Sequence, residues 1–262
     1  MARFFFRGTL TVMPEVDFLL VLPAYREQSR LPPYLRALTL TLAGAPFSTA
    51  LLVVDDGSPV AEREALRALM VTGREGSCVV LPLLPLAVNQ GKGGAILAGW
   101  RRGVVTARWL AFVDADGAVA AEEVRRVLEL THGAGERRCR WATRDAGGAR
   151  RVRRVRRRFF RRWLGWLFRL TVSVLLGRGA GDSQCGFKIV PTEWFARVDG
   201  ELRETGFCFD LELWLALRRA GADIEFTPVD WRDMPGGRLR VWRDGPLMLA
   251  RVWRLRKRFA AR

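Results

Sequence analysis

The chain has 262 residues, of which 49% are hydrophobic and 27% are charged. These proportions are typical of a folded globular protein and exclude an intrinsically disordered chain. The 44 Lys and Arg residues outnumber the 27 Asp and Glu residues and leave a formal net charge of +17, so we expect an anionic partner such as nucleic acid, anionic lipid or a phosphorylated substrate.

Four widely spaced cysteines and one histidine argue against a zinc site, and we interpret the cysteines as reduced thiols. Residues 1–13 lack the apolar core and cleavage site of a signal peptide. No segment has the roughly 18 uninterrupted apolar residues of a transmembrane helix. These features predict a protein that stays in the cytoplasm.

From Asp17 to about Arg144, short apolar runs alternate with helical segments. Runs of Val, Leu and Ala bounded by turn residues indicate strands that are buried on both faces. The pattern predicts an α/β fold with a mostly parallel, doubly wound sheet and helices on both faces. We expect strands at 18–25, 50–55, 78–84, 109–114 and 139–143, and helices at 33–42, 61–71, 94–105 and 121–130.

The composition changes after Arg144, where an arginine-rich segment leads into an apolar one. We expect one domain, 1–262, in which 17–144 binds a nucleotide, 145–180 forms a basic amphipathic segment and 181–262 forms the acceptor half. The last part should contain a polar loop at 181–184, strands at 187–190 and 224–231, helices at 191–198 and 209–220, and a basic final helix at about 247–259.

Paired carboxylates follow one predicted strand, at Asp114 and Asp116. Ligands of open α/β sheets bind beyond the carboxyl ends of the strands. Mg²⁺ and Mn²⁺ prefer oxygen ligands, commonly one or two carboxylates with substrate phosphates. The pair therefore predicts a metal site, although solvated loop carboxylates would give the same pattern.

A second acidic pair, Asp55 and Asp56, follows the neighbouring strand. Its carboxylates can accept hydrogen bonds from a nucleobase or from ribose hydroxyls. An Asx turn that opens the next helix, with Ser58 or Asp56 as its cap, explains the same residues, and both interpretations can hold together.

The glycine-rich stretch 91–94 contains Lys92 but lacks the glycine and the Ser or Thr that a Walker A motif requires. A glycine-rich helix start can still present backbone amides and a positive dipole to a phosphate. Lys92 and Lys188 are two of only three lysines in the chain, and both lie in glycine-containing motifs. This favours binding of an anion over a plain helix-entry loop.

Six motifs together resemble family 2 glycosyltransferases of the GT-A fold. They are Pro23-Ala24-Tyr25-x-Glu27, Asp55-Asp56-Gly57-Ser58, Asn89-x-Gly91-Lys92-Gly93, Asp114-Ala115-Asp116-Gly117-Ala118, Asp182-Ser183-Gln184-Cys185-Gly186-Phe187-Lys188 and Phe207-Cys208-Phe209-Asp210-x-Glu212. Their order most resembles the dolichyl-phosphate β-glucosyltransferase branch, with polyprenyl-phosphate mannose synthases as related enzymes.

The resemblance implies a role for each group of residues. The nucleotide-sugar would contact Pro23, Tyr25, Glu27, Asp55, Asp56, Lys92, Asp114, Arg238 and Arg240. The metal, Mg²⁺ or Mn²⁺, would be held by Asp114 and Asp116. Residues near the reacting centre would be Asp182, Gln184, Asp210 and Glu212, and Arg144 and Lys188 would face the acceptor phosphate.

The basic segment 150–162 interleaves arginines with apolar residues and runs into a Trp- and Phe-rich stretch. Apolar residues at positions 152, 155, 159, 163, 166 and 170 fall on one helical stripe, as in a helix that lies in a membrane interface. We therefore expect binding to an anionic membrane surface. A solvated arginine face over a core stripe is the alternative, and the chain carries no nucleic-acid-binding motif.

The resulting hypothesis is an inverting, metal-dependent enzyme that transfers glucose from UDP-glucose to dolichyl or undecaprenyl phosphate at the cytoplasmic membrane face. A hydroxyl acceptor or a GDP-mannose donor is the alternative within the family.

A sugar-phosphate nucleotidylyltransferase would need a Gly- and Lys-rich loop after the first strand, where Pro23-Ala24-Tyr25 stands. A nucleic-acid-binding module would leave the strand-end carboxylates unexplained. The sequence does not predict an oligomeric state.

Overall fold

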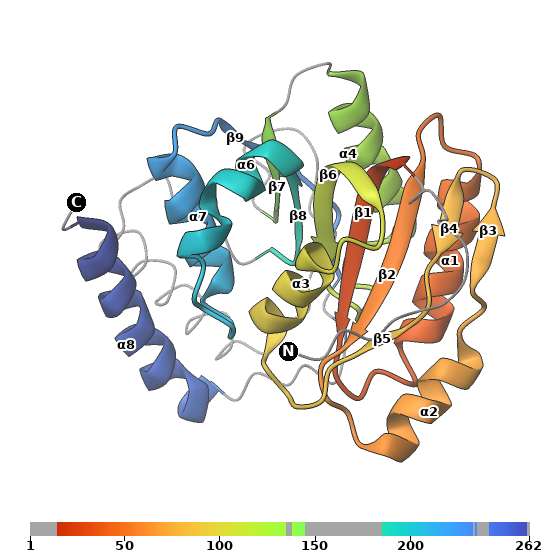
Figure 1. Cartoon of the computed structure of the whole chain (residues 1–262), viewed down its shortest axis with the longest axis horizontal. Coiled ribbons are helices and arrows are strands. Elements are labelled where there is room, and N and C mark those ends of the chain that lie inside the picture. Colours follow the sequence, from red (N-terminus) through yellow and green to blue (C-terminus); the bar gives the residue numbers. More distant parts are fainter. Residues whose placement is uncertain (1–14, 135–137, 145–184, 233, 235–240, 261–262) are drawn as a thin grey trace.

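The computed structural model describes residues 15–134, 138–144, 185–232, 234 and 241–260 (Figure 1). Its centre is a nine-stranded sheet in the order β3-β4-β2-β1-β6-β8-β7-β9, with β5 beside β2. The strands are β1 (Glu15–Ala24), β2 (Thr49–Asp55), β3 (Gly73–Glu75), β4 (Cys78–Val80), β5 (Leu84–Pro85), β6 (Thr106–Val113), β7 (Cys139–Thr143), β8 (Phe187–Pro191) and β9 (Ile224–Pro228). The expected α/β fold with a mostly parallel sheet is confirmed.

Helices cover both faces of the sheet (Figure 1). They are α1 (Leu31–Ala43), α2 (Val60–Leu69), α3 (Lys92–Arg101), α4 (Ala121–Gly133), α6 (Thr192–Val198), α7 (Phe209–Arg219) and α8 (Val241–Ala260), with a 3₁₀ turn at Asp199–Glu201. No helix among the described residues is long and apolar enough to cross a membrane.

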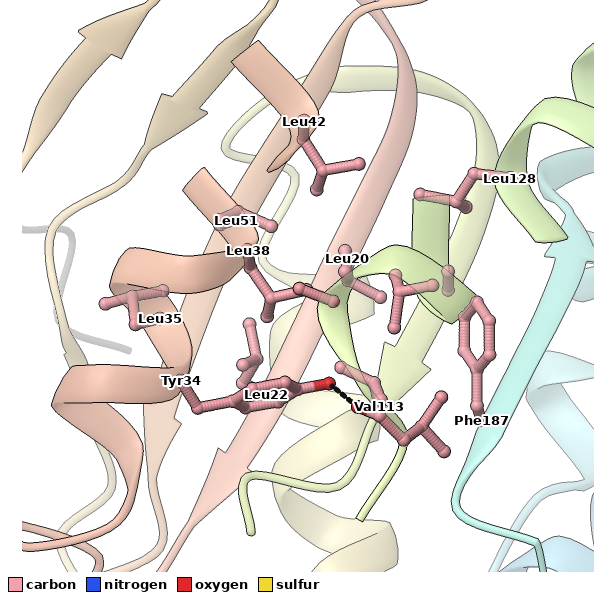
Figure 2. Packing of buried hydrophobic residues seen from close by; sticks show 14 of the residues in the cluster. Leu20, Leu22, Tyr34, Leu35, Leu38, Leu42, Leu51, Val113, Leu128 and Phe187 are labelled. Atoms are coloured by element: carbon pink, nitrogen blue, oxygen red, sulfur yellow. Dashed lines mark hydrogen bonds between the residues drawn. The ribbon is translucent and has the colours of Figure 1, made fainter. Parts of the chain in front are cut away.

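The central strand β1 is buried on both faces because successive side chains point in opposite directions. Leu19 and Val21 join a core with α3, α6, α7 and α8. Phe18, Leu20 and Leu22 join a second core with α1 and α4. Figure 2 shows part of this second core, in which the Tyr34 hydroxyl donates a 2.7 Å hydrogen bond to the carbonyl of Val119.

Strand direction decides which residues meet at the functional edge of the sheet. β1 pairs in parallel with β2 and β6, so the carboxyl ends of these three strands lie together. β8 enters antiparallel between β6 and β7, and its first residues therefore reach the same edge. β8 and β9 come from the second half of the sequence and share one sheet with the first half.

Several sequence-based boundaries differ from the structure. The strand expected at 78–84 is divided into β4 and β5, because Pro82 lies between them and cannot donate to a ladder. The exposed strand β3 was not predicted, since its three residues carry no apolar alternation. The final helix begins at Val241, earlier than expected, and β9 ends at Pro228. The expected segment 145–180 and the loop 181–184 lie outside the described residues.

Candidate active site

The acidic turn after β2 is tied to the loop before α3 by hydrogen bonds to the Asp56 side chain. Asp55 and Asp56 are both buried. Asp56 accepts the amides of Gln90 at 2.7 Å and Gly91 at 2.8 Å, so its carboxylate fixes the loop that leads into α3. Burial raises the pKa of Asp56, and these two hydrogen bonds oppose that rise. Asp56 therefore has a structural task that the sequence alone did not indicate.

Asp55 keeps one oxygen available. Its Oδ2 accepts the amide of Ser58 at 3.2 Å, as in the Asx-turn interpretation. Its Oδ1 is buried and receives no hydrogen bond within the described part of the chain. A buried acceptor without a partner costs free energy unless a ligand satisfies it. The expected cap of α2 by Ser58 or Asp56 is wrong, since its N-cap is Pro59 without a side-chain bond.

The turn after β1 lies beside this acidic turn. Arg26 adopts a positive φ of 55°, and its amide donates to Ser58 Oγ at 2.8 Å. Glu27 is buried and accepts a 2.8 Å hydrogen bond from Arg30 Nε. Pro23 lies opposite Val54 in the β1–β2 register, so this turn and the Asp55 turn lie side by side at the carboxyl ends of the two strands.

The two carboxylates after β6 have different surroundings. Asp116 Oδ1 accepts the amide of Ala118 at 3.0 Å. Burial, and then the neighbouring charge of Asp114, raises the pKa of Asp116. Asp114 lies against the backbone of Gly186 at the start of β8, where an added Cβ would come within 1.9 Å of Asp114 Oδ2. Gly186 is thus required for the observed position of Asp114.

Lys92 joins the donor-side carboxylate to a second acidic residue. Its Nζ lies 2.7 Å from Asp114 Oδ1 and 3.6 Å from Asp210 Oδ2. Burial alone would lower the pKa of Lys92, but the two carboxylates together outweigh it and raise the pKa. Lys92 therefore carries its charge between two chain segments that are far apart in sequence.

Lys188 completes this row of charges. Its fully buried Nζ lies 2.6 Å from Asp210 Oδ1 and donates to the carbonyl of Cys185 at 2.7 Å. Burial lowers the pKa of Lys188, and Asp210 opposes that shift. Lys188 and Lys92 each lie 5.1 Å from the ring centroid of Phe112. The expected contact of Lys188 with an acceptor phosphate does not agree with this placement, because the ammonium group is buried and already paired.

The acidic pair at the start of α7 is divided by the helix. Residues two positions apart on an α-helix point about 200° apart, so Asp210 and Glu212 cannot face one site. Glu212 Oε2 accepts the amides of Arg203 at 2.9 Å and Glu204 at 2.6 Å, and Glu212 Oε1 pairs with Arg258 of α8. Its surroundings indicate a structural role, and Asp210 alone faces the two lysines.

The glycine-rich start of α3 is packed against the loop before α7. The amide of Gly94 donates to the carbonyl of Thr205 at 3.0 Å. A Cβ on Gly93 would lie 2.5 Å from Phe209 Cβ. These contacts explain the glycines by close packing, so the expected phosphate-binding amides are at least partly occupied by protein.

Five further predicted residues lie at the margin or beyond. Arg144 follows β7, and its guanidinium carbon lies 5.3 Å from the ring centroid of Trp231. Outside the described residues lie Asp182, Gln184, Arg238 and Arg240. The structure thus assembles residues from all six motifs around Asp55, Asp114 and Asp210.

A divalent metal fits the donor set after β6. Among the described residues no three His, Cys, Asp or Glu side chains form a ready metal site. Asp114 and Asp116 nevertheless supply two carboxylates. Burial raises the pKa of Asp116, and the neighbouring charge of Asp114, which a cation would offset, raises it further. Mg²⁺ and Mn²⁺ sites of this kind are completed by phosphate oxygens of the substrate.

Comparison with known proteins shows the family of the chain. Residues 19–199 match the family model for glycosyl transferase family 2. The dolichyl-phosphate beta-glucosyltransferase of Drosophila melanogaster is 31% identical, over 86% of this chain and 70% of its own length. That of Dictyostelium discoideum is 27% identical, over 91% of this chain and 73% of its own length.

A solved structure shares the fold. Glucosyl-3-phosphoglycerate synthase from Mycobacterium tuberculosis, in complex with Mn²⁺, UDP-glucose and phosphoglyceric acid, superposes with a TM-score of 0.60 at 16% identity, covering 94% of this chain and 80% of that chain. Together with the family match over more than half of the sequence, the strand-end carboxylates identify the chain as a glycosyltransferase that belongs to family 2 and has the GT-A fold.

Proposed function

We propose that this glycosyltransferase transfers glucose from UDP-glucose to a polyprenyl phosphate, with inversion at the anomeric carbon. The observation that carries the proposal is the placement of Asp210 between Lys188 at 2.6 Å and Lys92 at 3.6 Å. A carboxylate whose two oxygens face ammonium groups is poorly placed to remove a proton. The similar proteins named dolichyl-phosphate beta-glucosyltransferase support the choice of sugar and acceptor.

The chemistry of the acceptor agrees with this geometry. A hydroxyl must lose a proton as it attacks, and it needs a general base. A phosphate monoester has a second pKa of about 6 and is largely the dianion near pH 7, so it attacks without a base. In this proposal Asp210 orients its surroundings, and Arg144 faces the incoming phosphate.

The nucleotide-sugar donor would lie at the carboxyl ends of β1, β2 and β6. Asp55 Oδ1 offers a buried acceptor for a nucleobase N–H or a ribose hydroxyl. Asp114 and Asp116 would hold Mg²⁺ or Mn²⁺, which neutralises charge on the departing diphosphate. The similar fold of the Mycobacterium tuberculosis synthase, solved with Mn²⁺ and UDP-glucose, supports this choice.

We further propose that the protein attaches peripherally to the cytoplasmic face of a membrane. On α8, Met248, Val252 and Leu255 are buried against the core. On the exposed side Trp253 is half-exposed, with Arg256 and Lys257 within 5.9 and 5.5 Å of its ring centroid. An exposed tryptophan among cations suits an anionic lipid surface.

The experiment for the function uses a panel of radiolabelled nucleotide sugars with purified protein, extracted membranes and Mn²⁺ or Mg²⁺. We expect label from UDP-glucose to enter the lipid phase and to require the metal. Label entering only from GDP-mannose would reassign the donor. Label from no donor entering any lipid would contradict the proposed acceptor.

A further inference from the structure

The ammonium group of Lys92 pairs with Asp114, one of the two carboxylates expected to hold the metal. Its Nζ lies 2.7 Å from Asp114 Oδ1, and its side chain is only 16% exposed. The other oxygen, Asp114 Oδ2, lies close to the backbone of Gly186, since a Cβ added to Gly186 would be only 1.9 Å from this oxygen. Among the described residues, Asp114 therefore has one oxygen against the backbone and one already paired.

We propose that Lys92 is the internal counter-cation of Asp114 and that it restricts divalent metal to entry together with the nucleotide-sugar. The inference rests on the proposed function, because it assumes that Asp114 and Asp116 hold the metal of a nucleotide-sugar site. It adds the order of binding and assigns that order to one side chain.

A metal ion that arrives alone must take Asp114 from Lys92. The ammonium and the divalent cation would then share one carboxylate, and the repulsion between their charges opposes binding of the metal alone. A nucleotide diphosphate brings negative charge that both cations can share. Metal and nucleotide should therefore bind far better together than separately.

Lys92 has a second carboxylate within reach. Asp210 Oδ2 lies 3.6 Å from its Nζ, so a small movement would transfer the ammonium from Asp114 to Asp210. Asp210 is nearly fully buried and is anchored by Lys188 on its other oxygen. Lys92 can thus release Asp114 without becoming an unpaired buried charge, which would be costly.

The test measures Mn²⁺ binding to the purified full chain by electron paramagnetic resonance of free Mn²⁺, with and without UDP. We expect the wild type to bind Mn²⁺ weakly alone and tightly with UDP. Lys92→Met should bind Mn²⁺ alone about tenfold more tightly, which is a modest fraction of the repulsion between the two cations. The stimulation of Mn²⁺ binding by UDP should shrink in this variant.

Three control variants make the result specific. Lys257→Met removes the same charge from α8 and should leave Mn²⁺ binding at the wild-type level. Lys92→Arg keeps the positive charge and should bind Mn²⁺ alone more weakly than Lys92→Met does. Adding Asp114→Asn to Lys92→Met should abolish the gain, since the ligand carboxylate is lost. Circular dichroism checks that each variant is folded.

Two outcomes would overturn the inference in different ways. If Lys92→Met binds Mn²⁺ alone no more tightly than the wild type does, while UDP still promotes Mn²⁺ binding to the wild type, Lys92 does not restrict the metal and the donor site stands. If UDP does not promote Mn²⁺ binding even to the wild type, the metal-dependent donor site itself is contradicted, whatever the acceptor.

Discussion

The backbone of Gly186 and the carboxylate of Asp114 lie in direct contact, and a methyl group at position 186 would approach Asp114 Oδ2 to 1.9 Å. The same two residues are joined by a 2.8 Å hydrogen bond from the amide of Asp114 to the carbonyl of Gly186. The start of β8 therefore sets the orientation of a carboxylate that follows β6.

This contact predicts that Gly186→Ala impairs the donor site more than it impairs folding. The end of the Asp114 side chain can rotate away from the new methyl group, so the fold should survive while the carboxylate is displaced. A displacement of about 1 Å can cost about a hundredfold in activity. Transfer rate and melting temperature are measured together. Gly200→Ala is the control, since nothing lies within 4 Å of a Cβ there.

The proposed absence of a general base predicts the pH dependence of Asp210→Asn. The variant should be slower, because Lys188 loses its counter-charge, but its rate above pH 7 should follow the shape of the wild-type profile. Initial rates between pH 6 and 9, normalised to the value at pH 7, provide the comparison. A variant whose activity rises steeply with pH toward that of the wild type would indicate that a hydroxyl proton must be removed.

Glu212 should act on stability and not on chemistry. Glu212→Ala leaves two amides and Arg258 without their acceptor, and we expect the free energy of unfolding to fall by about 2–3 kcal/mol, discounted because Arg258 is partly exposed. Urea denaturation measures the change. The matched control is Glu64→Ala, which breaks an exposed ion pair with Arg67 and should cost less than about 1 kcal/mol. Equal losses in the two variants would argue against this assignment.

The buried thiols predict a loss of stability at alkaline pH. Burial raises the pKa of Cys78, Cys139 and Cys208 to about 12. Since the unfolded chain releases these protons at lower pH, the contribution to stability is complete below about pH 9 and is lost as pH rises toward 12. Urea denaturation at pH 8 and pH 10 measures the change, and Cys139→Ala should reduce it. Rapid modification of these thiols by a disulfide reagent in the native protein at pH 8 would contradict their burial.

The sequence predicts the donor side of the site better than the centre. Strands β1, β2 and β6 are long apolar runs, and parallel pairing of such strands brings Asp55 and Asp114 to one edge. The contact between Lys188 and Asp210 depends on β8 entering antiparallel beside β6, which the local pattern does not indicate. That antiparallel entry also buries Lys188, so a lysine expected at the acceptor instead pairs within the protein.

Two other differences have separate causes, one local and one distant in sequence. The division between Asp210 and Glu212 follows from helical geometry and could have been predicted from a spacing of two residues. The glycines of α3 allow close packing of Phe209 and Thr205, contacts that are distant in sequence and leave no local pattern. A glycine-rich helix start has the same sequence pattern whether a phosphate or a protein loop lies against it.

The most direct test of the central claim compares two acceptors that differ in one group. Purified protein is incubated with labelled UDP-glucose, Mn²⁺ and either a polyprenyl phosphate or the polyprenol of the same chain length, with Asp116→Asn as the blank. We predict glucosylation of the phosphate, none of the alcohol, and none by the variant. Glucosylation of the polyprenol, or of neither lipid by a protein that binds UDP and Mn²⁺, would contradict the account.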